Sequence, residues 1–225
     1  MTEKGRIACD LQRCFLCRNS LPGWIQAIAA NKKNIRFRKG QLIVEEGQPV
    51  NGIYFMYEGI VKVHKKWGAE RELIIHFAKT GDIVGYRGLS DEKKFPVSVT
   101  ALEAVTMCFV ELDFFETTLG VNHQLTYQLM KLYANELLEA EERMRNLALM
   151  DVKGRLCDTL LTLQKRFGKT KAGYINLLIS RQDMASYTGT TYETLFRTMA
   201  LLEKEKLIHV NGKKISILKP AKLMQ

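Results

Sequence analysis

The stretch SRQDMASYTGTTYETLFRTMALLEKEKLI, residues 180–208, decides the fold of this chain. Ser180 is followed three residues later by Asp183, which is the spacing of a helix N-terminal capping box with Asp in place of Glu. Gly189 marks a turn, and a second helix is predicted to begin at one of the two threonines that follow it. Two short helices joined by a turn that contains Gly predict a helix-turn-helix.

The residues on either side extend this motif into a winged domain. Lys153–Phe167 has the apolar spacing of a helix, and two strand-like runs flank the dipeptide Asn211-Gly212. Asn-Gly between two such runs is the strongest short signal for a β-hairpin. We therefore predict a winged helix-turn-helix domain over residues 152–225, with the two lysines after Gly212 close to the tip of the wing.

The second helix of this domain carries side chains suited to reading DNA. A recognition helix enters the major groove with its N-terminal residues toward the base edges, where Arg197 can donate two hydrogen bonds to guanine and Glu193 can accept one from cytosine. The N–H groups at the start of the preceding helix, together with Arg181, suit a phosphate. The alternative is an ordinary helical hairpin with a Glu193–Arg197 surface ion pair. The predicted DNA-binding residues are Ser180, Arg181, Gln182, Thr191, Tyr192, Glu193, Phe196, Arg197, Lys213 and Lys214.

The net charge of +10 is concentrated in the same third of the chain. Residues 152–225 hold 14 of the 34 Lys and Arg residues but 5 of the 24 Asp and Glu residues. Such asymmetry indicates a polyanionic partner for that region, and nucleic acid is the commonest one, because clustered basic side chains release counterions from its backbone. A basic solvated surface that keeps the protein soluble is the alternative.

Residues 35–112 have a different residue pattern, in which short runs of β-branched and aromatic residues alternate with glycines. Many short strands with regular turn signals predict a sandwich or jelly roll. With a short helix near residues 21–30, we assign residues 21–120 to a β-roll sensor domain that follows a cysteine-containing segment, residues 1–20. The fold class is therefore α+β. The predicted strands are 42–44, 53–57, 60–63, 73–77, 97–100 and 105–110.

A long helix is predicted between the two domains. Residues 124–151 contain no Pro or Gly and repeat apolar side chains at spacings of three to five. Such a helix is about 40 Å long, which is longer than usual in a globular domain and favours a coiled-coil-like partner. We predict a dimerisation helix over residues 121–151 and a homodimer; the alternative is a helix packed along its own domain. The predicted dimer-interface residues are Leu129, Leu132, Leu137, Ala140, Met144 and Leu147.

Several protein classes are disfavoured by the sequence. No apolar run approaches the roughly 18 residues that span a bilayer, and the start of the chain, MTEKGRIACD, lacks the apolar core of a signal peptide. We therefore expect a cytoplasmic protein with no membrane partner, whose five cysteines are free thiols or metal ligands rather than disulfides. An enzyme is not expected, because the chain has no P-loop, no G-x-G-x-x-G, no H-E-x-x-H and no nucleophile elbow.

Taken together, four segments resemble the CRP/FNR family of transcription regulators. They are FRKGQLIVEEGQPVNGIYFMYEGIVKV (37–63), HFAKTGDIVGYRGL (76–89), ALEAVTMCFVEL (101–112) and the helix-turn-helix quoted above. The resemblance implies a cyclic-nucleotide-binding-like sensor and a homodimer on a palindromic double-stranded DNA site, with half-sites about one helical turn apart. It also implies contact with RNA polymerase. Phe196 stands where FNR-type members usually carry Ser or Gly and can pack on a thymine methyl instead, so the half-site sequence stays open.

Cyclic AMP is not an expected ligand. CRP-type members bind it through a glutamate and an Arg-Ser or Arg-Thr pair in the segment after Gly81-Asp82. This chain carries Tyr86-Arg87 near the position of that glutamate, and no Arg-Ser or Arg-Thr occurs near Phe95. Without those partners a cyclic phosphate loses its charge-assisted hydrogen bonds.

The cysteines resemble a different branch of the family. Cys9, Cys14 and Cys17 precede the β-roll, and Cys108 lies where FNR proteins carry an internal cluster ligand. The resemblance implies an oxygen-labile [4Fe–4S] cluster that reads oxygen, nitric oxide or redox state, and four thiolates are what such a cluster requires. The C-x4-C-x2-C spacing departs from the usual FNR trio and also occurs in plant-type two-iron ferredoxins, so the cluster type stays open.

Other inputs remain as alternatives. The four cysteines can also hold zinc or act as a thiol switch. A small effector or haem in the β-roll is a further possibility, as is a sensor that has lost its ligand. FNR proteins place an acidic residue in the dimer seam, and the matching position here is Ala140. We therefore hypothesise that dimerisation depends less on a cluster than it does in those proteins.

Overall fold

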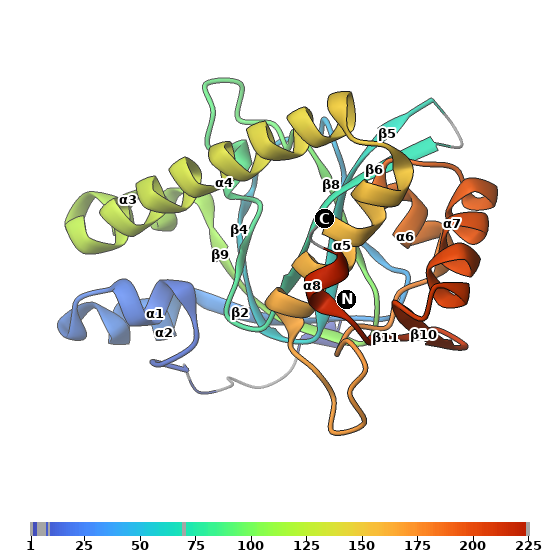
Figure 1. The fold of residues 1–225 in the computed structure, drawn as a ribbon. Helices are drawn as coiled ribbons and strands as arrows, with labels where there is room; N and C mark the ends of the chain where they lie inside the picture. The colour runs from blue at the N-terminus through green and yellow to red at the C-terminus, as the bar shows by residue number, and fades with distance from the viewer. Residues whose placement is uncertain (1, 4–7, 9, 69–70, 224–225) are drawn as a thin grey trace. The chain divides into compact units, whose positions relative to one another are not determined.

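The computed structural model describes residues 2–3, 8, 10–68 and 71–223 (Figure 1). It divides into two compact units, residues 1–136 and 137–225. The strands are β1 (Thr2–Glu3), β2 (Lys32–Phe37), β3 (Leu42–Val44), β4 (Gly52–Glu58), β5 (Ile60–Trp67), β6 (Arg71–Lys79), β7 (Ile83–Val84), β8 (Ser98–Ala101), β9 (Val105–Glu111), β10 (Ile208–Asn211) and β11 (Lys214–Ile217). The helices are α1 (Phe15–Asn19), η1 (Pro22–Trp24), α2 (Ile25–Asn31), η2 (Tyr86–Gly88), α3 (Leu112–Val121), α4 (His123–Leu149), α5 (Val152–Phe167), α6 (Arg181–Thr188), α7 (Tyr192–Lys204) and α8 (Pro220–Leu223).

The first unit is a β-roll of two antiparallel sheets. One sheet has the strand order β1-β2-β9-β4-β7, and the other has the order β3-β8-β5-β6. The six predicted strands are all present, with ends that differ by at most four residues, and the α+β fold class is confirmed. The sequence pattern did not predict β1, β2 or β7, because β7 has two residues and β2 reads KKNIRF, which is polar in its first half.

The core of the β-roll lies between the two sheets and under α3. Ile53 and Phe55 of β4 and Met107 of β9 are fully buried there. The ring of Phe115 on α3 lies 5.8 Å from the ring of Phe55 and is itself fully buried. Burying each such side chain contributes about 1.5–3 kcal/mol, so β4 and β9, which are buried on both faces, contribute much of the stability of this layer.

One turn of the β-roll requires glycine. Gly59, between β4 and β5, has φ +96°, and a Cβ atom added there would lie 2.8 Å from the carbonyl oxygen of Ala104. Glycine adopts this left-handed conformation without a side-chain clash. The chain can therefore turn sharply from β4 in one sheet to β5 in the other, close to the loop before β9.

Segments outside the sheets complete the same core. In α1, Phe15, Leu16 and Cys17 are buried in it, so part of the predicted N-terminal segment belongs to the β-roll. Leu125 and Leu129 from the first half of α4 are buried in the same cluster. The long helix predicted over residues 124–151 is therefore present, but its N-terminal half is an integral part of the sensor domain.

The second unit begins inside α4 and contains α5, α6, α7, the β10–β11 hairpin and α8. Leu156 and Leu160 of α5 and Leu195 and Leu202 of α7 are fully buried. The helix-turn-helix and the hairpin occur where the sequence predicts them. The boundary between the two compact units falls at residues 136 and 137, whereas the sequence pattern sets the whole helix apart as a separate segment.

Candidate functional site

The helix-turn-helix is held in shape by caps at both of its helices. The Ser180 hydroxyl accepts a hydrogen bond from the backbone N–H of Asp183 at 2.9 Å, so Ser180 is the N-cap of α6, as predicted. Gly189 ends α6 in the left-handed conformation, with φ +71° and ψ +47°. Thr191 is the N-cap of α7, and its Oγ1 accepts from the backbone N–H of Thr194 at 3.2 Å. Short-range signals in the sequence thus place both helices.

The exposed face of α7 carries the residues predicted to read bases. Tyr192, Glu193, Phe196 and Arg197 are all exposed, while Leu195 is fully buried on the opposite face. Phe196 is 63% exposed, which is a large apolar surface for a side chain with no role in the core. The structure therefore brings these four side chains together on one surface at the N-terminal end of the second helix.

The start of α6 is organised differently from the prediction. Gln182 is exposed, but Ser180 is half-buried and engaged as the cap. Arg181 does not extend freely toward solvent: its Nη2 donates to the carbonyl oxygen of Gly212 at 2.6 Å, which ties α6 to the wing. Burial lowers the pKa of the Arg181 guanidinium. Arg181 therefore also holds the wing through Nη2, and its predicted contact with a phosphate stays a prediction.

The wing is a two-residue hairpin whose turn lies one residue later than predicted. Asn211 pairs with Lys214 as the last pair of the β10–β11 ladder. The turn residues are therefore Gly212, with φ +57°, and Lys213. Glycine at the first central position suits a hairpin turn. Lys213 and Lys214 are both exposed at this end of the hairpin, so the prediction of two lysines near the tip is confirmed.

Two arginines that the sequence reasoning missed fasten the end of α6. Arg155 on α5 donates to the carbonyl oxygens of Thr188 and Gly189, both at 3.2 Å. Arg143 on α4 donates to the carbonyl oxygen of Tyr187 at 2.6 Å and lies 4.5 Å from the centre of its ring. These contacts occupy carbonyl groups that the helix itself leaves without partners. No local sequence signal identifies them, because the partners meet only in the folded unit.

Helix α4 has an exposed apolar stripe, which includes part of the predicted dimer interface. Leu137 and Met144 are 60% and 67% exposed, and Ala140 is exposed between them. Leu129, by contrast, is 5% exposed and packs in the β-roll core. The prediction for Leu129 is wrong, because a side chain already covered by its own domain has no surface left for a partner. The two remaining members of the predicted set are half-buried Leu132 and exposed Leu147.

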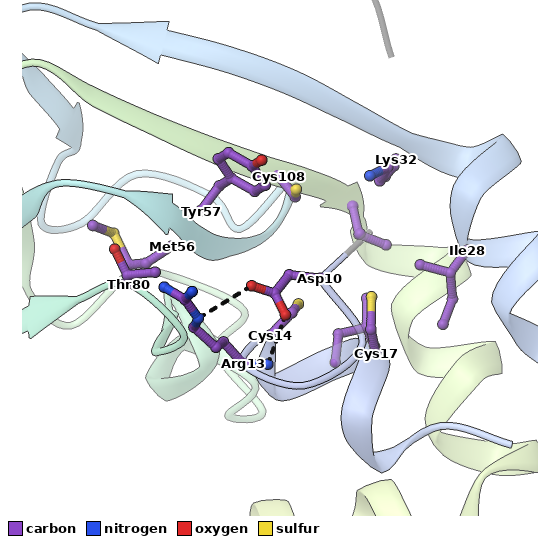
Figure 2. Close-up of a pocket in the computed structure, with 12 residues that line it drawn as sticks. Asp10, Arg13, Cys14, Cys17, Ile28, Lys32, Met56, Tyr57, Thr80 and Cys108 are labelled. Atoms are coloured by element: carbon purple, nitrogen blue, oxygen red, sulfur yellow. Dashed lines mark hydrogen bonds and ion pairs between the residues drawn. The ribbon is translucent and has the colours of Figure 1, made fainter. Parts of the chain in front are cut away.

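The structure gathers three of the four predicted cluster cysteines around one pocket. Cys14 and Cys17 come from the start of α1, and Cys108 comes from β9 (Figure 2). All three line the pocket, together with the buried side chain of Lys32 from β2. Cys9, the fourth predicted ligand, lies outside the described residues. Cysteines far apart in the sequence are thus brought to one place by the fold.

The environment of Cys14 favours the thiolate form. A hydrogen bond with the Cys17 side chain lowers the pKa of Cys14 to about 7, and the charge of Lys32 acts in the same direction. The Cys108 sulfur accepts a hydrogen bond from Nδ2 of Asn34 at 3.2 Å. Thiolates are the form that binds iron or zinc and that reacts with oxidants. Cys157, by contrast, is buried in the second unit, and burial raises its pKa.

The donor set fits an iron–sulfur cluster or a zinc ion in chemical type. Among the described residues, however, no group of three or more His, Cys, Asp or Glu side chains is already close enough to hold a metal ion. The fit therefore concerns the kind of ligand and the pocket that the cysteines share. It does not extend to a complete coordination sphere.

A second polar cluster ties η2 to α4 within the first unit. Nη2 of Arg87 lies 2.8 Å from Oε2 of Glu136, and its Nε donates to the same oxygen at 3.1 Å. The Tyr86 hydroxyl donates to the other carboxylate oxygen of Glu136. Burial and the charge of Glu136 raise the pKa of Tyr133, whose hydroxyl donates to the Tyr86 carbonyl, to about 12. Tyr86 and Arg87, from the segment where CRP-type members bind cyclic AMP, are therefore engaged by this chain's own helix.

Helices that could cross a bilayer are not found in the part of the chain that the structure describes, since each is too short or too polar.

Two family models match this chain. The model described as "Cyclic nucleotide-binding domain" matches residues 34–121, and the model described as "Crp-like helix-turn-helix domain" matches residues 154–225. These ranges coincide with the β-roll and with the domain that contains α6, α7 and the wing. Both parts of the predicted architecture are therefore supported independently.

Individual proteins match over nearly the full length. The chain is 27% identical over 225 residues to the Anaerobic regulatory protein of Pasteurella multocida (strain Pm70), covering 96% of this chain and 81% of that protein. It is 27% identical over 235 residues to the Fumarate and nitrate reduction regulatory protein of Vibrio cholerae serotype O1, covering 99% and 92%. The solved structure of FixK2 from Bradyrhizobium japonicum matches with a TM-score of 0.76 and 25% identity, covering 85% of this chain and 95% of that one.

These matches extend over the β-roll, the long helix and the helix-turn-helix of this chain. Together with the two family models, they show that the chain belongs to the CRP/FNR family of DNA-binding transcription regulators.

Proposed function

We propose that this chain is an FNR-like regulator that binds a palindromic DNA site as a homodimer. We propose further that an iron–sulfur cluster held by Cys9, Cys14, Cys17 and Cys108 controls this binding in response to oxygen, nitric oxide or redox state. The observation that carries the sensor is the shared pocket, which is lined by cysteines from α1 and from β9. Relatives named for anaerobic regulation and for fumarate and nitrate reduction support the same reading.

The homodimer rests on the exposed stripe of α4. Apolar residues recur there at alternating spacings of three and four, which is the pattern of the a and d positions of a coiled coil. Two copies of such a stripe bury each other around a two-fold axis. The sequence prediction omitted the first two of these positions. The stripe consists of Met130, Tyr133, Leu137, Ala140, Met144 and Leu147, all exposed.

A two-fold dimer presents one α7 to each half of a palindrome. The exposed side chains at the N-terminal end of α7 then face the base edges, with Arg197 suited to guanine and Phe196 to a thymine methyl. Lys213 and Lys214 at the wing suit the phosphates. Contact with RNA polymerase follows from the family, and the cytoplasm is the compartment in which a regulator of this kind meets its DNA.

The cluster requires four thiolates, which suits the [4Fe–4S] type. The described residues supply three of them from two separate elements of the β-roll. When bound, such a cluster supplies a centre that oxygen and nitric oxide attack. Because α1 and the first half of α4 pack in the same apolar core, a movement of α1 caused by a change at the cysteines would alter the packing of α4.

The proposal is tested by anaerobic reconstitution with iron and sulfide, followed by absorbance spectra and iron and sulfide assays before and after exposure to air. We expect a broad absorbance near about 400 nm that bleaches in air, as is characteristic of thiolate-bound clusters. Cys14→Ala, Cys17→Ala and Cys108→Ala should each lose it, and the buried Cys157→Ala is the matched control. A colourless, iron-free wild-type protein would rule the cluster out.

The DNA-binding part is measured separately. Fluorescence anisotropy with selected palindromic DNA, under anaerobic conditions and again after air, should show tighter binding in one state. Dependence of the affinity on salt should follow the number of phosphate contacts. Equal affinity for DNA before and after exposure to air would be consistent with a DNA-binding regulator and would rule out control of that binding by a cluster.

A thiol switch is the second candidate, and a specific observation favours it. The pKa of Cys14 is lowered to about 7 by the hydrogen bond with Cys17, so a reactive thiolate lies beside a second thiol. Oxidation would join the two sulfurs as a disulfide, with two protons released and two electrons passed to a thiol oxidant. Iron-free protein treated with diamide should then lose two hydrogens per chain by mass spectrometry, and Cys17→Ala should abolish that loss.

A further inference from the structure

Strand β2 places two polar side chains on its buried face. Over its first three residues, Lys32 and Asn34 are buried and Lys33 is exposed. Lys32 is 7% exposed and Asn34 is 4% exposed. Lysine is almost never buried to this degree without a compensating partner, because an unpaired buried charge is costly. Both side chains interact with other groups of the chain, and the nearby cysteines are among those groups.

Both side chains meet the cysteines. In the sheet, Lys32 pairs with Val110 and Asn34 pairs with Cys108. Lys32 lines the pocket that Cys14, Cys17 and Cys108 also line, as Figure 2 shows. Nδ2 of Asn34 donates to the Cys108 sulfur at 3.2 Å. The strand that the sequence pattern missed therefore supplies a positive charge and an N–H donor to the cysteine pocket.

The other charged side chains at the pocket largely balance each other. Nε of Arg13 lies 3.5 Å from Oδ2 of Asp10, and the Arg13 side chain is 74% exposed. Two hydrogen bonds, from the backbone N–H groups of Gln12 and Arg13, also hold the Asp10 carboxylate. Among the described residues that line this pocket, Lys32 is the buried cationic side chain.

Thiolate ligands concentrate negative charge in a place of low dielectric constant. A buried cation and an N–H···S hydrogen bond each offset part of that charge, because charge-assisted interactions are strong where water is excluded. Outer partners of this kind orient metal ligands and strengthen their binding. In iron–sulfur sites, hydrogen bonds to the sulfurs and solvent exposure help to set the reduction potential of the cluster.

We propose that Lys32 and Asn34 are positioning residues of the cysteine site, in which Asn34 orients the Cys108 sulfur and Lys32 balances the charge of the thiolate-bound iron. This inference rests on the proposed iron–sulfur function and goes beyond it by naming residues that are not ligands. Asn34 acts on Cys108 through its hydrogen bond. Lys32 acts on the whole pocket through its charge.

The test compares iron retention in anaerobically reconstituted full-length variants. Lys32→Met removes the charge and keeps the length of the side chain, and Lys33→Met is the matched control. Lys33 is exposed on the same strand, with its Nζ 2.7 Å from Oε1 of Glu111. Release of iron to an excess of a chelator is followed by absorbance. Loss of an outer partner typically costs about 10- to 100-fold in metal affinity, so Lys32→Met should release iron about tenfold faster or more, with Lys33→Met close to wild type.

Two further variants separate charge from folding. Lys32→Arg keeps the charge and should retain iron close to the wild-type rate. Asn34→Leu keeps a similar volume without the N–H donor and should release iron faster than wild type. Tryptophan fluorescence during chemical denaturation checks that each variant is folded, and Lys32→Gln is a second neutral variant for the case in which Lys32→Met does not fold.

The outcomes distinguish this inference from the proposed function. If wild-type protein takes up no iron and sulfide, the cluster itself is wrong and the role of Lys32 falls with it. If wild-type protein holds the cluster and Lys32→Met releases iron no faster than Lys33→Met, the cluster stands and the role of Lys32 is overturned. Faster release from Lys32→Met, restored by Lys32→Arg, supports the proposal.

Discussion

Replacing Leu129 with Ala should destabilise the β-roll itself, whereas replacing Met144 with Ala should weaken the dimer and leave each β-roll intact. Both residues lie on the long helix α4, and the sequence pattern assigns them to the same interface. In the structure Leu129 is 5% exposed in the β-roll core and Met144 is 67% exposed on the stripe. The two substitutions therefore separate the two apolar faces of one helix.

The expected cost at Leu129 follows from its burial. Truncating a fully buried Leu to Ala removes its apolar contacts and leaves a cavity, which typically costs about 2–5 kcal/mol of unfolding free energy. Leu125 and Leu16 are buried in the same cluster, so the site has little freedom to collapse around the smaller side chain. We therefore expect Leu129→Ala to lower the free energy of unfolding by an amount in the upper half of that range.

Met144→Ala is expected to weaken the association of the dimer and not the stability of the β-roll. Burying a whole Met side chain contributes about 1.5–3 kcal/mol, and about two-thirds of this one is exposed in the single chain. Because Ala retains the Cβ, the loss is about 1–1.5 kcal/mol per copy, and the two-fold axis doubles it. A loss of about 2–3 kcal/mol corresponds to a dimer dissociation constant that is roughly 30- to 150-fold weaker.

The assay uses the two tryptophans, Trp24 and Trp67, which both lie in the first unit. Trp24 donates from Nε1 to Oγ1 of Thr118 at 3.1 Å and stacks on Phe114, so its fluorescence reports the unfolding of the β-roll. Denaturant titrations at low protein concentration give the stability of the unit, and sedimentation equilibrium gives the dissociation constant. The reasoning is refuted if Met144→Ala lowers β-roll stability as much as Leu129→Ala, or if the dimer is equally strong in both.

Three further predictions concern other parts of the molecule. Gly189→Ala should lower the free energy of unfolding by about 1–2 kcal/mol because its backbone is left-handed, and by about 1 kcal/mol more because the added Cβ would lie 2.5 Å from Cδ2 of Leu147. Gly173→Ala, with φ +81° and nothing within 4 Å, should show the backbone loss alone in unfolding followed by circular dichroism. Equal losses in the two variants would contradict the contact with Leu147. The hydrogen bond with His64 is the main cause that lowers the pKa of Glu72 to about 2 from 4.5. The contribution of Glu72 to the free energy of unfolding is therefore complete above about pH 4.5 and is lost as the pH falls toward 2. Glu72→Gln should remove about 1–2 kcal/mol of this pH dependence after solvent screening, measured by denaturation monitored with tryptophan fluorescence, and an unchanged pH profile would count against the pair. Arg197→Ala should weaken binding to the cognate palindrome by about 1–3 kcal/mol with a smaller effect on unrelated DNA, measured by anisotropy at one salt concentration; an equal loss on both DNAs would make it a phosphate contact.

The hypothesis about Ala140 can be checked in the same sedimentation experiment. An acidic residue in a dimer seam would repel its copy across the two-fold axis, and Ala at this exposed position of the stripe avoids that repulsion. Iron-free protein should therefore dimerise at micromolar concentration. A monomer under those conditions would show that dimerisation depends on the cysteine site after all.

The helix-turn-helix could be predicted in detail because its signals are local. Ser180, Gly189 and Thr191 each act within a few residues of the backbone, through a cap or a left-handed turn. The strands of the β-roll were predictable because apolar runs between glycines mark strands locally, although partners such as β2 and β9 are far apart in the sequence. Even so, the wing turn lies one residue beyond the position that Asn211-Gly212 indicates, because the register of the two strands sets the turn.

Other features could not be predicted, because they depend on contacts between distant segments. The polar start of β2 gave no strand signal, yet its lysine and asparagine are buried against the cysteine pocket. Arg181 is a side-chain type that binds phosphate, and only the fold shows that its Nη2 donates to the carbonyl of Gly212. Arg143 and Arg155 give no sign in the sequence that they fasten the end of α6.

The sequence by itself determined the fold class, the order of the two domains, the long helix between them and the residues that cap and expose the second helix of the DNA-binding motif. Hydrophobic period, capping residues and glycine turns act over a few residues and can be read without the fold. Tertiary structure alone decided which face of α4 is covered by the β-roll and which remains for a partner, and it alone brought Lys32 and Asn34 to the cysteines. A helix or a strand can present an apolar or polar residue, but only the packing of the remaining chain determines what that residue meets.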